Sequence, residues 1–124
     1  TSFVAENMLD NKTIQISVEE LEAYLSKTNP KDFLLLDVRT PKEFEEGTIQ
    51  NAMNIPLDEI RNHIDFIKEQ NKPIVIFCRR GLRGYLAELI LKHHHIKDMV
   101  NVAGGISVWE MYGGLVLKPE EVEA

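Results

Sequence analysis

The chain has 124 residues, of which 44% are hydrophobic and 27% are charged. This length suits one globular domain with its own core and leaves no room for two. Its 14 Lys and Arg residues are outnumbered by 20 Asp and Glu residues, and a net charge of −6 has the wrong sign for a domain that tracks a phosphate backbone. We therefore expect no nucleic acid partner.

The sequence shows no signal for a membrane or a metal. No apolar run reaches the roughly 18 to 20 residues that span a bilayer, and the N-terminus lacks the basic and apolar segments of a signal peptide. We therefore expect a cytoplasmic protein with no membrane partner. Cys78 is the single cysteine, so it cannot close an internal disulfide, and one thiol cannot build a multi-thiolate zinc site or an iron–sulfur cluster.

The first residues are expected to lead in from an upstream domain. Phe3, Val4, Met8 and Leu9 recur at roughly helical spacing before polar residues 10–12 interrupt them. The chain is thus expected to contain a linker or helix at residues 1–12, a single domain at residues 13–117 and a tail at residues 118–124.

From Thr13 onward, short apolar runs alternate with amphipathic segments of helical length, a pattern typical of βα units on a largely parallel sheet. The expected strands are residues 13–16, 33–38, 52–55, 74–77 and 99–102. The second and fourth are apolar at nearly every position, as central strands covered on both faces are.

The helices fall between these strands. Ser17 is expected to cap a helix that runs to Leu25, with Glu20 completing a capping box. A short helix begins at Pro41 and ends near Gly47. The remaining helical segments are residues 57–69, as one or two helices, residues 82–92 and residues 107–112. The sequence therefore predicts a single α/β domain with a five-stranded, mostly parallel sheet flanked by helices.

Cys78 stands at the carboxyl end of the fourth strand, the edge of a parallel α/β sheet where ligands bind. The free backbone N–H groups and the dipole of the helix that follows make a pocket for negative charge. A thiolate or a persulfide would be stabilised there. The loop residues expected to bind substrate are Arg79, Arg80, Gly81, Leu82 and Arg83.

Glycines and arginines give this loop its expected character. Gly81 and Gly84 are expected to free the backbone and to bring amides close to a ligand. Arg79, Arg80 and Arg83 are expected to draw an anionic donor to the loop of an otherwise acidic chain. A buried, purely structural cysteine is the alternative, but packing alone needs no guanidinium groups beside it.

The chain resembles a single rhodanese-homology domain over about residues 13–117. Its loop from Cys78 to Arg83 resembles the family's active-site loop, and residues 36–44, 46–56 and 102–109 resemble the other family motifs in the family's order. Thr48 stands where the family commonly has His. The resemblance implies a three-layer fold and a catalytic cysteine at Cys78, with no cofactor in this domain.

The resemblance also implies a sulfurtransferase. Cys78 would take a sulfane sulfur from an anionic donor such as thiosulfate, polysulfide or coenzyme A persulfide and pass it from a persulfide to a thiol acceptor. A non-catalytic binding or regulatory module is the alternative, although such modules usually lack the cysteine. Phosphatases of this fold have a loop one residue longer than the four residues between Cys78 and Arg83, which disfavours that activity.

Residues 81–87 and 3–9 are similar to the rhodanese domain and linker of coenzyme A-disulfide reductases and NADH-dependent persulfide reductases. This similarity implies an upstream reductase domain as a partner, and FAD, NAD and coenzyme A in a full-length protein. The chain itself has no glycine-rich dinucleotide fingerprint, so none of these cofactors is expected in it.

Three residues outside the loop are candidates for the pocket rim. Asp37 and Arg39 lie at the end of the second strand, where they would form the rim or, alternatively, a salt bridge that orders the turn at Thr40 and Pro41. Trp109 is expected to pack over the turn at Gly104 and Gly105 and could shape access to the pocket.

Two charged or titratable runs favour a structural role. His93, His94 and His95 would point about 100° apart on a helix, so they do not converge on a metal ion, and a helix end is the better interpretation. Glu43, Glu45 and Glu46 are expected to form a solvated helical face.

Overall fold

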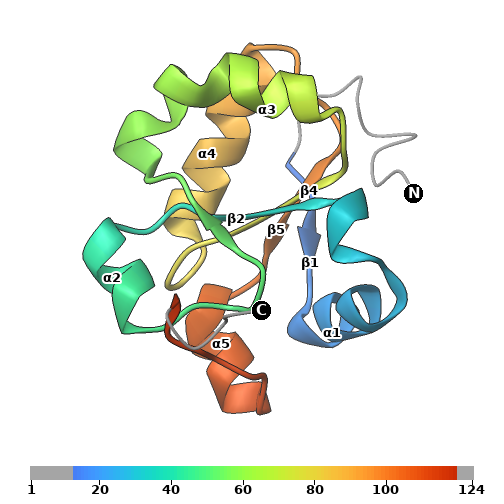
Figure 1. Ribbon diagram of the computed structural model, residues 1–124, viewed down its shortest axis with the longest axis vertical. Helices are drawn as coiled ribbons and strands as arrows, with labels where there is room; N and C mark the ends of the chain where they lie inside the picture. Colours follow the sequence, from blue (N-terminus) through green and yellow to red (C-terminus); the bar gives the residue numbers. More distant parts are fainter. Residues whose placement is uncertain (1–12, 120–124) are drawn as a thin grey trace.

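The computed structural model describes residues 13–119 (Figure 1). Five strands form one sheet in the order β1-β5-β4-β2-β3, and every strand pair in it is parallel. The strands are β1 Gln15–Ile16, β2 Leu34–Asp37, β3 Met53–Asn54, β4 Ile74–Phe77 and β5 Met99–Val102. The α/β fold and all five predicted strands are confirmed, and β1, β2 and β3 are shorter than predicted. The predicted linker at residues 1–12 lies outside the described residues.

The helices also follow the predicted order. They are α1 Val18–Lys27, η1 Pro30–Asp32, α2 Pro41–Glu46, η2 Leu57–His63, α3 Ile64–Gln70, α4 Leu82–His93 and α5 Gly105–Tyr112. The capping box of α1 is confirmed, since Ser17 Oγ accepts from the Glu20 N–H at 3.0 Å and the Glu20 carboxylate accepts from the Ser17 N–H at 2.7 Å. The short 3₁₀ helix η1 was not predicted, and α5 begins two residues early.

The sheet is the middle of three layers. Helices α1 and α5 cover one face, and η2, α3 and α4 cover the other (Figure 1). Side chains alternate along β4, so Val75 and Phe77 point to the first face while Ile74 and Ile76 point to the second. Cys78 continues the second set and joins the core under α4.

Helix α4 buries a face that is built partly from small residues. Leu82, Tyr85, Leu86 and Leu89 are exposed, whereas the face with Gly84, Ala87, Glu88 and Leu91 is buried. Small residues let this face approach the sheet closely, and the Glu88 carboxylate accepts from the Ile14 N–H at 3.2 Å. Burial raises the pKa of Glu88 to about 7.

Candidate active site

Cys78 follows β4 directly and is only 1% exposed. The chain folds back over its sulfur, because the Gly81 N–H donates to Cys78 Sγ at 3.0 Å. A hollow of about 190 Å³ lies over the loop and is lined by Cys78, Arg79, Arg80, Leu82 and Arg83. The structure therefore brings the cysteine and the predicted loop residues together at the carboxyl edge of the sheet.

Two glycines of this loop differ in what they do. Gly81 has φ of 116°, in the left-handed region that favours glycine, and it caps the start of α4. Gly84 lies inside α4, and its φ angle is not positive. A Cβ atom there would overlap Asn101 Oδ1. The expectation that Gly84 frees the backbone for a ligand is therefore wrong, because it makes room for a side chain.

The first turn of α5 supports the loop from behind. The Ile106 N–H donates to the Cys78 carbonyl at 2.8 Å, and the Ser107 N–H donates to the Arg79 carbonyl at 3.0 Å. Gly105 allows this approach, since a Cβ atom on it would overlap the Cys78 carbonyl oxygen. Sequence reasoning placed Gly105 in a turn but missed this support, which a glycine pair directly before a helix could have suggested.

The loop arginines are not equivalent. Arg83 forms a bidentate ion pair with Glu43 of α2, with N–O distances of 2.7 and 3.1 Å. Hydrogen bonding to Arg83 lowers the pKa of Glu43 to about 2, and Glu43 in turn raises the pKa of Arg83. Glu43 is thus not part of a solvated face, and the charge of Arg83 is already balanced. Arg79 and Arg80 are exposed, and within residues 13–119 neither forms an ion pair.

Asp37 and Arg39 form a buried salt bridge with an N–O distance of 2.7 Å. The Thr48 hydroxyl, at the position where the family commonly has His, donates to Asp37 at 2.9 Å, and Arg39 also donates to the Gly47 carbonyl. The salt-bridge alternative is therefore confirmed. Arg39 additionally lines a hollow of about 130 Å³ next to Arg79, so its rim role stays a prediction.

Trp109 lies away from the cysteine loop. Its ring is buried on the face covered by α1 and α5, and its Nε1–H donates to the Leu115 carbonyl at 3.0 Å. The ring packs against Gly114, while Val108 packs over Gly104. Trp109 does not pack over the turn at Gly104 and Gly105 as predicted, and it lines neither hollow beside Cys78.

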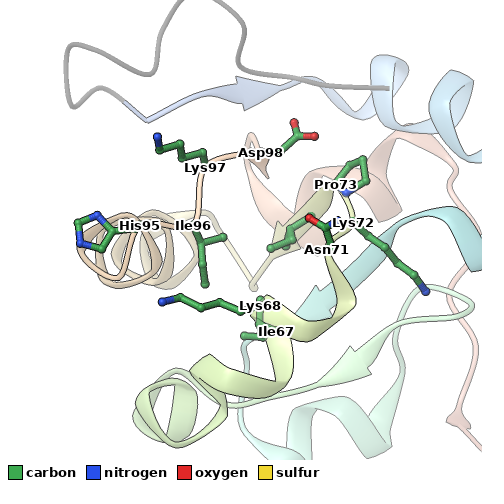
Figure 2. A pocket seen from close by; sticks show the side chains of 10 residues that line it. Ile67, Lys68, Asn71, Lys72, Pro73, His95, Ile96, Lys97 and Asp98 are labelled. Atoms are coloured by element: carbon green, nitrogen blue, oxygen red, sulfur yellow. The ribbon is translucent and has the colours of Figure 1, made fainter.

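A larger hollow, of about 380 Å³, lies at the opposite end of the sheet, where β4 and β5 begin. Figure 2 shows its basic side chains, Lys68, Lys72, His95 and Lys97. Helix α4 ends at His93 as predicted for the histidine run. Among residues 13–119, no group of three His, Cys, Asp or Glu side chains is arranged to hold a metal ion.

Comparison with known proteins agrees with this geometry. Residues 17–112 match the model of the rhodanese-like domain family. A sulfurtransferase of Allochromatium vinosum is 34% identical over 106 residues, covering 86% of this chain and 96% of that protein. A rhodanese-related protein from Thermoplasma volcanium has a TM-score of 0.72 at 31% identity and covers 89% of this chain and 99% of its own.

The chain therefore belongs to the rhodanese-like domain family. The reduced CoADR-RHD of Bacillus anthracis is also similar, with a TM-score of 0.68 at 32% identity, over 78% of this chain and 16% of that one. The predicted resemblance to such rhodanese domains is confirmed. The chain spans less than two thirds of several other curated relatives. None of the helices within residues 13–119 has the length and apolar character needed to cross a membrane.

Proposed function

We propose that this domain is a sulfurtransferase in which Cys78 carries a sulfane sulfur between two other molecules. The observation that carries the proposal is the loop geometry: the Gly81 N–H lies 3.0 Å from Cys78 Sγ at the edge of a hollow lined by Arg79 and Arg80. A backbone N–H donor and exposed positive charges both favour an anionic sulfur at this position. The sulfurtransferase of Allochromatium vinosum supports the same activity class.

The first half-reaction loads the cysteine. The Cys78 thiolate attacks the outer sulfur of the donor, a new S–S bond forms, and the donor's own bond to that sulfur breaks. With thiosulfate, the leaving group is sulfite, which takes the bonding electron pair. Cys78 becomes a persulfide anion, and the loop N–H can stabilise its charge.

The second half-reaction transfers the sulfur from Cys78 to the acceptor. An acceptor thiolate attacks the terminal sulfur of the persulfide, and the S–S bond to Cys78 breaks with its electron pair going to Cys78 Sγ. The acceptor leaves as a persulfide and the enzyme thiolate is regenerated. With cyanide as the acceptor in an assay, the product is thiocyanate. No oxidant or reductant is consumed in either half-reaction.

The donor is an anion because the charges that remain available at the loop are positive. Arg83 is balanced by Glu43, so Arg79 and Arg80 are the side chains we assign to donor attraction. Thiosulfate, polysulfide and coenzyme A persulfide all satisfy this requirement. Arg39, beside Arg79 in the adjoining hollow, is our candidate for a further contact with a larger donor.

A phosphatase is disfavoured by the same residues. Phosphate-ester hydrolysis needs a general acid for the leaving group. The carboxyl group hydrogen-bonded to the loop is Glu43, and its ion pair with Arg83 holds its pKa at about 2. It is therefore ionised at neutral pH and cannot donate a proton. A non-catalytic module is the second alternative, and the presence of Cys78 argues against it.

The larger context is also a proposal. Similarity to the CoADR-RHD of Bacillus anthracis supports an upstream reductase partner that accepts sulfur from Cys78. FAD, NAD and coenzyme A would then belong to that partner and not to this domain. A cytoplasmic location fits such a partner and is likewise proposed.

Intact-mass measurement after incubation with donor tests the proposal. Wild-type chain treated with thiosulfate, polysulfide or coenzyme A persulfide should gain the mass of one sulfur atom, and cyanide should remove it. Cys78→Ser is the matched control and should gain nothing, because the chain has no second cysteine. Wild-type protein that stays unmodified with all three donors would contradict the function.

A further inference from the structure

Asn101 is a polar residue in the middle of an apolar strand, and it reaches the cysteine loop. It lies in β5 between Val100 and Val102 and is 0% exposed. Its Nδ2 donates to the Gly81 carbonyl oxygen at 3.0 Å. A buried amide costs free energy unless it is hydrogen-bonded, so this position holds a polar group where an aliphatic one would pack more simply.

Gly81 connects this hydrogen bond to the sulfur. Its N–H donates to Cys78 Sγ, and its carbonyl accepts both from Asn101 and from the Tyr85 N–H in the first turn of α4. Both peptide groups of Gly81 are therefore held. Without the hydrogen bond from Asn101, the backbone of Gly81 would rotate more freely, and its N–H could turn away from the sulfur.

Gly84 makes the space that Asn101 uses. A Cβ atom on Gly84 would overlap the Asn101 side chain. Glycine inside a helix costs about 1 kcal/mol relative to alanine, so α4 is weakened at the position where the amide enters. Asn101 Oδ1 has no hydrogen-bond partner within the described part of the chain, which leaves the bond to Gly81 as the polar contact of this side chain.

We infer that Asn101 is a positioning residue for sulfur transfer, which acts through Gly81 to keep an N–H donor on Cys78 Sγ. The inference rests on the proposed function, because it takes Cys78 as the nucleophile. A hydrogen bond to the charged form of a group favours that form. Loss of Asn101 therefore raises the pH at which Cys78 becomes reactive and weakens the hold on the persulfide.

The test is the pH dependence of Cys78 alkylation by iodoacetamide in wild type, Asn101→Leu and Asn54→Leu. Leucine has the same branched shape and the same number of side-chain heavy atoms but no donor. Asn54 is a matched control because its Nδ2 also donates to backbone carbonyls, those of Asp37 and Arg39, without contacting the loop. We expect the midpoint to rise by about one pH unit in Asn101→Leu and to stay at the wild-type value in Asn54→Leu.

Further variants keep the test decisive if Asn101→Leu does not fold. Circular dichroism checks that each protein is folded, and Asn101→Val replaces Asn101→Leu if leucine does not fit. Gly84→Ala displaces the same amide, so its shift should match that of Asn101→Leu and should not add to it in the double variant.

The possible failures are distinct. A folded Asn101→Leu or Asn101→Val with the wild-type midpoint would overturn the inference, and so would fully additive shifts with Gly84→Ala. A wild type that takes up no sulfur from any donor would instead overturn the proposed function, whatever the alkylation profile shows.

Discussion

The sheet carries a basic hollow at each of its ends. The hollow at the amino end is about 380 Å³ and is lined by Lys68, Lys72 and Lys97, whereas the hollow at the carboxyl end is about 190 Å³ and is lined by Arg79 and Arg80. The larger one lacks a cysteine. The smaller one has Cys78, with a backbone N–H on its sulfur.

The difference shows that neither size nor positive charge defines the candidate site. At the carboxyl end, four residues separate β4 from α4, and the loop folds back so that the Gly81 N–H reaches Cys78 Sγ. At the amino end, α3 and α4 finish and the chain enters β4 and β5, so helix C-termini with carbonyl groups lie there instead. Carbonyl ends of helices disfavour an anion, which lysines must then offset.

Cys78→Ser gives the largest expected effect and tests the comparison directly. We expect thiosulfate:cyanide transfer to fall by at least about 1,000-fold, because the nucleophile is lost. Lys97→Met, at the amino-end hollow, is the control and should keep wild-type turnover. Equal losses in the two variants would mean that the two ends of the sheet had been assigned wrongly.

Gly105→Ala tests the support of the loop by α5. The new Cβ would overlap the Cys78 carbonyl oxygen, and alanine would have to adopt a left-handed φ of 64°. We therefore expect the free energy of unfolding to fall by about 3 kcal/mol. Gly113→Ala is a matched control with φ of 103° and open space around it, and it should cost only about 1 kcal/mol. Urea titration measures both, and similar losses would show that the close approach to Cys78 is unimportant.

Glu88 lies on α4, between the two ends of the sheet, and should make the free energy of unfolding depend on pH. Its folded pKa of about 7 exceeds the unfolded value of 4.5, so the native state holds the proton more tightly. Stability from this group is full below pH 4.5 and is lost as the pH rises through 7. We expect a loss of about 3 kcal/mol over that range, relative to Glu88→Gln. Parallel pH–stability curves from urea titration would contradict this expectation.

The double variant Arg79→Met and Arg80→Met has the smallest expected effect on activity. Loading of Cys78 by thiosulfate should slow about tenfold at low ionic strength and by less in salt, because these charges act at long range. Turnover at saturating donor should change little. Stopped-flow measurement of loading checks this, with Lys68→Met and Lys72→Met as the charge-matched control. An equal slowing in the control would indicate a general effect of net charge.

Much of the fold follows from short stretches of the chain. The capping box at Ser17, the apolar runs of β2 and β4 and the position of Cys78 between a strand and a helix are set by residues within a few positions of one another. Each depends on hydrogen bonding or periodicity that a single strand or helical turn already contains. These features were predicted correctly for that reason.

Contacts between distant segments were not predicted. Glu43 pairs with Arg83 across 40 residues of sequence, and Asn101 bonds to Gly81 across 20. Each contact depends on which polar groups still lack a partner when two elements come together, and the packing of those elements decides this.

The sequence by itself determined that Cys78 lies in a basic loop at the carboxyl edge of a parallel sheet, because strand, loop and helix follow one another in the chain. Only the tertiary structure decided how the loop is held, through Asn101 on Gly81, α5 on the Cys78 carbonyl and Glu43 on Arg83. Local propensity and spacing bring the nucleophile to the edge of the sheet. The hydrogen bonds that surround it come from elements that meet only when the sheet and its helices assemble.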